Sequence, residues 1–228
     1  GELNRNETSV NNDQGDSYEG QWLGEKKHGK GIFTWASGNS YEGDWRLDAR
    51  HGKGVFRWAD GDRYEGDFVN AKRHGTGTYY FSNGDVYEGE WYYGEKYGRG
   101  TFTSANGNKY EGDWQQDKKH GQGFHTWHYG DKYMGGWDQD KKNGQGVYIW
   151  ENGNSYEGKW EKDIRTGYGV YTWANGDKYE GDFDNNIRSG EGAITYKLDG
   201  THYDGFWKQG KYQGKGTHIW PNGDKYVG

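Results

Sequence analysis

Aromatic, glycine and charged residues alternate along this chain in short stretches. Tyr41–Trp45 reads Tyr-Glu-Gly-Asp-Trp, and Gly54–Trp58 reads Gly-Val-Phe-Arg-Trp. A period of two is typical of a β-strand with one apolar and one solvated face. A polar turn containing His-Gly separates the two stretches, and Asp-Gly-Asp follows them. Because Asx-Gly pairs favour the positive φ of hairpin turns, the pattern predicts a β-hairpin and leaves no room for a helix.

The hairpin pattern recurs along the chain. Tyr-x-Gly returns every 23 residues from Tyr18 to Tyr179, then after 24 residues at Tyr203, and again at Tyr226. The additional residue of the long step lies in Tyr196–His202, because the glycines before it keep their phase. Successive hairpins joined by short turns should pair as one antiparallel meander.

This spacing divides the chain into a leader and an array of repeats. We predict an array over residues 18–228, with nine full repeats in 18–225 and a tenth that begins at Tyr226. Residues 1–17 form a polar leader, and its end resembles the tail of a preceding repeat.

The repeating pattern YEGxW–xxGKxHGxG–xFxW–xNGxx resembles the MORN (membrane occupation and recognition nexus) repeat family, and the resemblance covers residues 18–228. It implies an all-β fold: an elongated, single-layer, twisted antiparallel sheet of tandem 23-residue β-hairpins. It also implies a non-catalytic scaffold or adaptor in the cytoplasm, in a radial-spoke, ciliary or cytoskeletal assembly. A regulatory repeat segment of a larger protein is an alternative, because such arrays are also appended to enzymes.

The composition fits a sheet held together by rings. The chain has 43 Gly, 13 Trp, 21 Tyr and 8 Phe in 228 residues, with few aliphatic side chains. So few aliphatic residues are usually a sign of disorder, but each buried ring removes a large area from water. A glycine between Tyr and Trp leaves bare backbone on which a ring can lie. The two excesses are therefore one feature, an aromatic-over-glycine ladder.

The aromatic face is the first candidate for a binding surface. A single sheet should leave part of this face exposed, and exposed aromatic patches mark interaction sites. We predict that a partner helix or peptide lies in an aromatic groove. The alternative is that the rings only pack on one another. The residues chosen for this groove are Trp22, Tyr41, Trp45, Trp91, Tyr110, Trp114, Trp137, Tyr156 and Trp160.

Four departures from the repeat indicate where specificity could reside. Ser104 replaces a Trp, and His125 replaces a Phe. Met134 and Gly136 remove two acidic positions. We predict a partner-specific patch within residues 102–137.

Charged residues suggest a second kind of partner. Basic residues gather in the first turn of each repeat, along one predicted edge, whereas acids such as Asp62 and Asp131 occupy the second turns. A basic stripe could bind anionic lipid head groups. The candidates are Lys26, Lys27, Lys72, Arg73, Lys118, Lys119, Lys141 and Lys142. Against this, acidic residues outnumber basic ones by 35 to 29, and the net charge of −6 also disfavours nucleic acid. The unpaired strand of a terminal hairpin would allow homo-oligomers.

No cofactor, metal site or catalytic residue is predicted. The His-Gly turns lie one repeat apart, about 9–10 Å, which is too far for shared metal coordination. Zero Cys excludes a thiolate site. The acidic stripe recurs in every repeat, which favours a solvated face over paired catalytic carboxylates. No Walker, GxSxG or HExxH motif is present.

Overall fold

A computed structural model describes residues 4–228, and these residues form strands and turns without any helix. No helix among them could therefore cross a membrane. This confirms the predicted all-β class of tandem antiparallel hairpins. The chain divides into two compact halves, residues up to 117 and residues 118–228.

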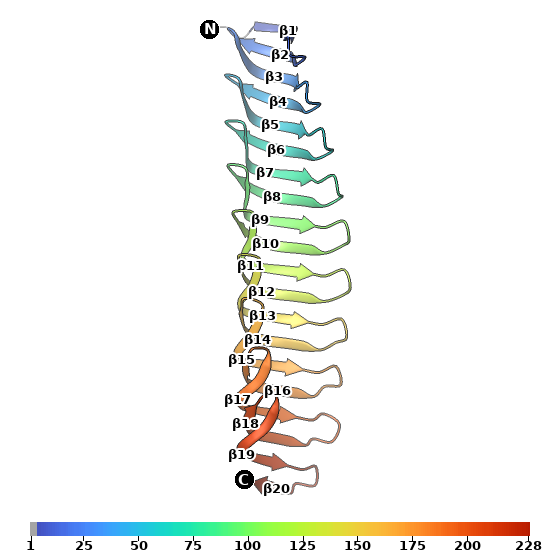
Figure 1. The fold of residues 1–228 in the computed structure, drawn as a ribbon, viewed down its shortest axis with the longest axis vertical. Coiled ribbons are helices and arrows are strands. Elements are labelled where there is room, and N and C mark those ends of the chain that lie inside the picture. The colour runs from blue at the N-terminus through green and yellow to red at the C-terminus, as the bar shows by residue number, and fades with distance from the viewer. Residues whose placement is uncertain (1–3) are drawn as a thin grey trace. The chain divides into compact units, whose positions relative to one another are not determined.

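The first half is a single antiparallel sheet in which each strand pairs with the next along the chain (Figure 1). Its strands are β1 (Asn4–Asn11), β2 (Ser17–Leu23), β3 (Lys26–Thr34), β4 (Ser40–Arg46), β5 (Ala49–Arg57), β6 (Arg63–Val69), β7 (Lys72–Tyr80), β8 (Val86–Tyr92), β9 (Glu95–Thr103) and β10 (Lys109–Gln115). Part of the predicted leader is thus a strand.

The second half repeats this arrangement. Its strands are β11 (Lys118–Thr126), β12 (Lys132–Asp138), β13 (Lys141–Ile149), β14 (Ser155–Glu161), β15 (Ile164–Thr172), β16 (Lys178–Asp184), β17 (Ile187–Thr195), β18 (His202–Lys208), β19 (Lys211–Ile219) and β20 (Lys225–Val227). The longer step of the repeat falls in the turn before β18, where the Tyr196 N–H donates to the Thr201 carbonyl.

Register aligns like residues into rows that cross the strands. Tyr64 of β6 lies between Phe56 and Tyr79 of the flanking strands. Gly66 likewise lies between Gly54 and Gly77. Each sheet therefore has an aromatic row on one face and a continuous row of glycine beside it.

Two kinds of turn connect the strands. The turn before β5 is Leu47–Asp48, and both residues have positive φ (50° and 72°), as a two-residue type I′ turn requires. The turn after β3 is closed by the Trp35 N–H donating to the Asn39 carbonyl at 3.0 Å. The basic residues predicted in the first turn instead begin the following strand, as Lys26 and Lys27 do.

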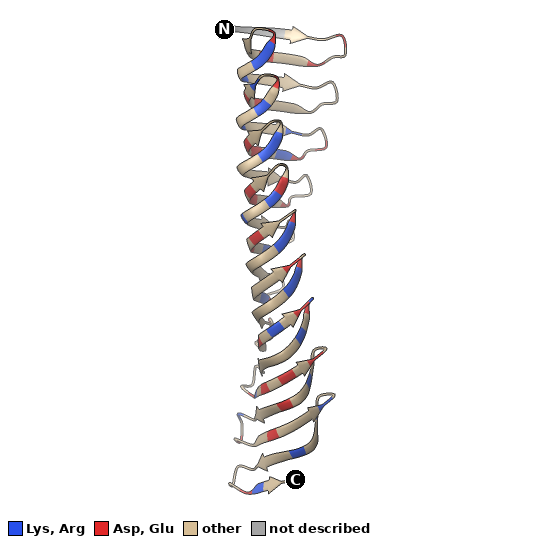
Figure 2. Ribbon diagram, turned by 90° about the vertical axis from the view of Figure 1, so that its left-hand side faces the viewer, with Lys and Arg blue, Asp and Glu red and all other residues tan. Residues whose placement is uncertain are grey.

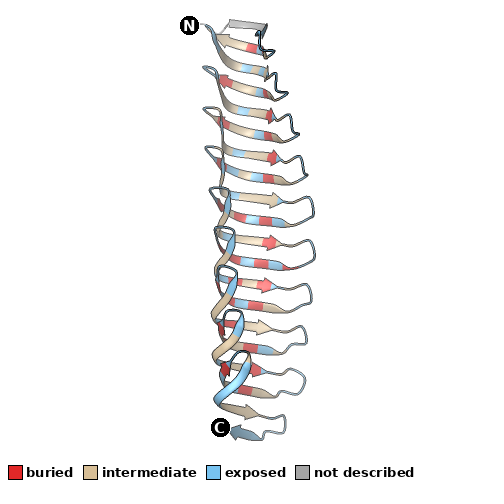
Figure 3. Cartoon of the chain, in the orientation of Figure 1, coloured by how far each residue is buried: buried red, intermediate tan, exposed pale blue. Residues whose placement is uncertain are grey.

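The aromatic face is the core of each half, and burial recurs strand after strand (Figure 3). The largest side chains that are fully buried are all tyrosines from equivalent positions of successive repeats. They are Tyr41, Tyr64, Tyr87, Tyr110, Tyr133, Tyr156 and Tyr179. A single layer can bury these rings because each lies on its own sheet and between neighbouring rings.

Candidate binding groove

The glycine row exists because a tyrosine ring covers it. A Cβ atom on Gly77 would lie 2.3–2.7 Å from the hydroxyl and two ring carbons of Tyr64. The same ring covers Gly66, and its hydroxyl donates to the Asp67 carbonyl at 3.1 Å. The predicted aromatic-over-glycine arrangement is confirmed, and the ring belongs to the same repeat as the glycines it covers.

The covering tyrosines alternate with Trp or Phe in an edge-to-face ladder. Tyr64 contacts Phe68 and Trp91 with centroids 5.1 and 5.3 Å apart and planes at 89° and 85°. In the first half the ladder runs through Tyr18, Trp45, Tyr41, Phe68, Tyr64, Trp91, Tyr87, Trp114 and Tyr110. In the second half it runs through Trp137, Tyr133, Trp160, Tyr156, Phe183, Tyr179, Trp207 and Tyr203. Each contact stabilises the sheet by about 0.5–1.5 kcal/mol beyond the area it buries.

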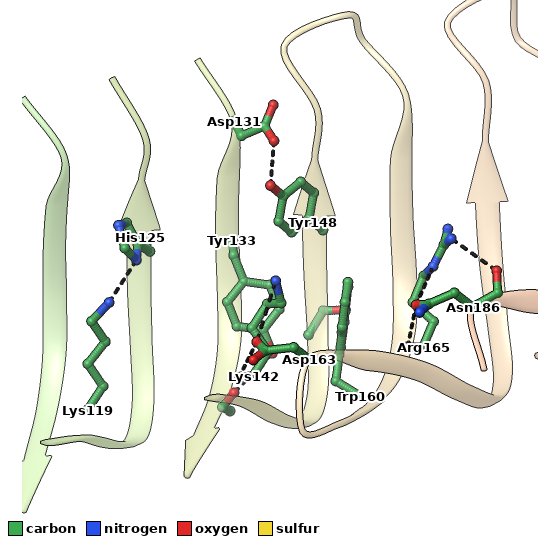
Figure 4. Close-up of polar contacts among 12 residues, drawn as sticks. Lys119, His125, Asp131, Tyr133, Lys142, Tyr148, Trp160, Asp163, Arg165 and Asn186 are labelled. Atoms are coloured by element: carbon green, nitrogen blue, oxygen red, sulfur yellow. Dashed lines mark hydrogen bonds and ion pairs between the residues drawn. The ribbon is translucent and has the colours of Figure 1, made fainter. Parts of the chain in front are cut away.

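A basic side chain is enclosed by rings in nearly every repeat. Lys142 Nζ lies 4.9 Å from the Trp160 centroid, 5.0 Å from that of Tyr148 and 5.8 Å from that of Tyr133, and 3.6 Å from Asp163 Oδ1 (Figure 4). Burial lowers the pKa of Lys142, and the Asp163 carboxylate opposes that shift. Cations over ring faces are attracted by the ring quadrupole. We call this place the cation position; its occupants are Lys27, Arg50, Arg73, Lys96, Lys119, Lys142, Arg165 and Arg188.

The cation position corrects the predicted basic edge. Four of the eight candidate lipid-binding residues occupy it and are half-buried under rings: Lys27, Arg73, Lys119 and Lys142. The other four are exposed: Lys26, Lys72, Lys118 and Lys141. The sequence does carry a signal for the cation position. A basic residue recurs at the same place in successive repeats, in register with aromatic residues.

The ladder also corrects the predicted aromatic groove. Tyr41, Trp45, Trp91, Tyr110, Trp114, Trp137, Tyr156 and Trp160 are each at most 5% exposed, and Trp22 is half-buried. The eight buried rings pack on one another and on the glycine backbone, so they leave little surface on which a partner could lie.

The four predicted specificity residues have different surroundings. Ser104 belongs to the first half, where its hydroxyl lies 2.5 Å from Asn106 Oδ1 within its own turn. His125 is buried and stacked on Trp127, with centroids 4.2 Å apart. Burial, helped by Lys119 and Lys142, lowers the pKa of His125 to about 4, so the ring is neutral near pH 7 and replaces a phenyl ring.

The remaining two specificity residues lie on the opposite face from His125. Met134 is 61% exposed. Gly136 is buried, and a Cβ atom there would lie 2.0 Å from the Asn143 carbonyl oxygen. Close backbone approach therefore accounts for Gly136 without any partner.

A groove of about 1010 Å³ lies on the first half, on the face away from the rings. Its floor is the glycine row, which has no side chain on this face. One wall alternates acidic and smaller residues in register, since Val55 lies between Glu42 and Glu65. The wall continues through Glu19, Ile32, Thr78 and Glu88.

The second wall is neutralised by its own ion pairs. Lys30 Nζ lies 2.6 Å from Asp44 Oδ1, and the equivalent Lys53–Asp67 pair is at 2.7 Å. Asp44 also accepts the Lys53 N–H at 3.0 Å, where the register shifts beyond Gly43. The carboxylates of this wall are thus used within the sheet. Charged positions recur along the strands in Figure 2.

Two glutamates of the first wall keep their charge available. Glu42 and Glu88 are exposed, and neither makes a side-chain hydrogen bond or ion pair with the described residues. Glu65 pairs with Arg63 from the neighbouring row. The groove therefore carries net negative charge, and a cationic ligand is the complementary one.

Sequence reasoning assigned these glutamates to a solvated face and missed the groove. The signal was a row of glycine flanked on both sides by charged rows. Among the described residues no group of three or more His, Asp or Glu is arranged to hold a metal ion.

Comparisons with known proteins agree with the geometry. A family model described as the MORN repeat matches residues 18–40, 41–63, 64–86, 87–109, 110–132, 133–155, 156–178, 179–197 and 203–225. No curated protein sequence gives a match.

Among solved structures, the TCP10 domain of Danio rerio CPAP, in complex with a peptide of STIL, matches with a TM-score of 0.51 and 12% identity. That match covers 89% of this chain and 92% of that one. The Drosophila melanogaster SAS-4 (dCPAP) TCP domain, in complex with a proline-rich motif of Ana2, has a TM-score of 0.43 and 15% identity, covering 77% and 88%. At such identity the first likeness shows the fold.

Proposed function

The chain belongs to the MORN repeat family, and we propose that it is a non-catalytic scaffold that binds a basic peptide segment of a partner protein in the acidic groove of its first half. The observation that carries this proposal is the groove wall of Glu19, Glu42, Glu65 and Glu88, opposite a wall whose charges are already paired. The likeness to a domain solved with a bound peptide is consistent with it.

Electrostatic complementarity decides which partner fits. The acceptors are carboxylates at the surface, so each ion pair with a Lys or Arg contributes about 0.2–1 kcal/mol and is screened by salt. Several such pairs, repeated along the groove, would give a salt-dependent affinity and favour rapid association. Acidic segments would be repelled.

The setting is part of the same proposal. We place the chain in the cytoplasm, in a ciliary or cytoskeletal assembly, because scaffolds of this repeat family serve there. A fluorescent fusion that fills the cytosol evenly would contradict this placement. Self-association of the chain is a further component, which sedimentation over a range of protein concentrations measures.

Anionic-lipid binding has less support. Half of its candidate residues are held under rings at the cation position. The exposed candidates remain, but they lie on a protein whose net charge is −6; they are Lys26, Lys72, Lys118 and Lys141. Co-sedimentation with phosphoinositide vesicles at physiological salt should leave the chain in the supernatant.

The proposal is tested with labelled peptides and the full chain. A peptide of Lys and Ser in mixed order should bind, and its affinity should fall as salt rises, whereas a Glu and Ser peptide should not bind. The variant Glu42→Gln/Glu88→Gln should weaken binding. The control Glu25→Gln/Glu95→Gln removes two exposed carboxylates outside the groove lining and should not. Equal weakening by the two variants, or no binding of the basic peptide, would contradict the proposal.

A further inference from the structure

We infer that the groove selects an extended basic peptide in which Lys or Arg recurs at every third position, an inference that rests on the proposed function. It follows from the spacing of the groove glutamates, the width of the groove and the geometry of extended chains.

The glutamates of the groove are regularly spaced, with one glutamate per repeat. Glu42 and Glu65 both pair in register with Val55, and Glu65 and Glu88 both pair with Thr78. Successive glutamates are therefore two strands apart. At a strand spacing of about 4.8 Å, the glutamates are about 9.6 Å apart.

The groove is too narrow for a helix. Its two walls come from residues that flank one glycine on a strand, such as Glu42 and Asp44 on either side of Gly43. Their Cα atoms are about 6.8 Å apart along the strand. A helix with its side chains is about 10–12 Å across, so an extended chain is the backbone that can reach the glycine floor.

Three residues of an extended chain match the spacing between successive glutamates. Three residues of polyproline II advance about 9.3 Å, and every third side chain points the same way. Three residues of a β-strand advance about 9.9 Å, but side chains three residues apart on a strand point to opposite faces, so polyproline II is the conformation that fits. Over three intervals the polyproline II mismatch is about 1 Å, which a flexible Lys or Arg side chain absorbs. Two residues advance only about 6.2 Å, and in a run of four contiguous bases only the first and the fourth match neighbouring glutamates.

The two residues between successive bases meet a different surface. Between the glutamates lie Ile32, Val55 and Thr78, and beneath them lies glycine backbone. Ile32 is 43% exposed, so apolar side chains cover it favourably. Proline suits these places because it holds the chain extended before binding and lowers the entropy lost on association.

The test uses the full chain and three labelled peptides of equal length and composition. One repeats the triplet Lys-Pro-Pro, the second has Lys at alternate positions followed by the remaining Pro, and the third has all Lys together. With four Lys in each peptide, the triplet peptide reaches about four glutamates, two more than either of the others. At about 0.5 kcal/mol for each exposed pair, it should bind about fivefold more tightly.

Matched variants assign that preference to the groove. Glu42→Gln/Glu88→Gln should remove the fivefold preference, whereas Glu25→Gln/Glu95→Gln should keep it, and circular dichroism checks that both fold. If all three peptides bind equally and only the groove variant weakens them, the spacing inference is overturned and the proposed function stands. If no peptide binds, or both variants weaken binding alike, the proposed function fails as well.

Discussion

The requirement for glycine at Gly77 can be separated from the requirement at Gly66 by changing one ring. Both glycines lie under Tyr64, but their surroundings differ. The nearest atoms to a Cβ on Gly77 are all in the Tyr64 side chain, at 2.3–2.7 Å. A Cβ on Gly66 would also lie 2.5 Å from Gly77 Cα and 2.5 Å from the Thr76 carbonyl oxygen.

The structure gives the magnitude for Gly77→Ala. The added methyl displaces the Tyr64 ring, which is fully buried. Displacement removes one hydrogen bond, worth about 1 kcal/mol, and two edge-to-face contacts worth about 0.5–1.5 kcal/mol each. We expect a loss of about 3 kcal/mol in the free energy of unfolding. In a Tyr64→Ala background the three closest contacts are removed, and Gly77→Ala should stabilise by about 0.5 kcal/mol, because alanine suits a strand better than glycine.

Urea unfolding followed by circular dichroism measures both steps of this cycle, with m-values compared to check that the transition is unchanged. Gly66→Ala is the matched control: its cost should persist in the Tyr64→Ala background, because the backbone clash remains. If Gly77→Ala costs the same in both backgrounds, the ring is not what demands glycine there, and the ladder argument fails.

Three further predictions concern protonation of buried side chains and the hydrogen bonds that the Asp62 side chain makes to the next turn. Burial raises the pKa of Tyr18 and of Tyr156 to about 12, so folding favours their protonated form. The urea midpoint should therefore fall as pH rises from 10 to 12, and unfolding in this range should increase phenolate absorbance. The lowered pKa of His125, about 4, means that stability is lost as pH falls from about 6.5 towards 4, and His125→Phe should reduce this acid sensitivity in urea titrations. Asp62 accepts hydrogen bonds from the Ser82 N–H and the Tyr79 hydroxyl, so Asp62→Ala should cost about 2 kcal/mol in urea unfolding. Asp62→Asn should cost less, because Asn39 accepts the equivalent N–H in the preceding repeat.

Most of the fold could be predicted from the sequence because every repeat contains the same local signals for strands and turns. Alternation fixed the faces, Asx-Gly pairs fixed turns such as the one closed by Trp58, and the single long step located the wider turn after Tyr196. The pairing of glycine with aromatic residues also predicted the ladder. Each inference used local chemistry that recurs in every hairpin, so one misjudged residue could not change the result.

The candidate site could not be predicted in the same way, because binding depends on which groups remain unsatisfied after folding. Trp91 and Glu88 recur with equal regularity, and nothing local says that the ring is consumed by the ladder while the carboxylate stays at the surface. Likewise, Lys26 and Lys27 are adjacent and identical in type, yet only Lys27 points under the rings.

What separates these residues is cross-strand register. A ring has to cover the glycine row because a bare single sheet has no second layer to exclude water from it. The aromatic side chains, and the basic side chain at the cation position, are therefore enclosed in this packing. The opposite side of the same glycine row then stays uncovered and forms the floor of the groove. The carboxylates that flank it differ in whether they accept a backbone N–H at a bulge or pair with a neighbouring lysine. Asp44 makes both interactions, because it accepts the Lys53 N–H and pairs with Lys30, whereas Glu42 makes neither. The acidic groove is therefore a consequence of the device that stabilises the sheet, and a chain that preserves the ladder can vary its groove residues freely to suit its partner.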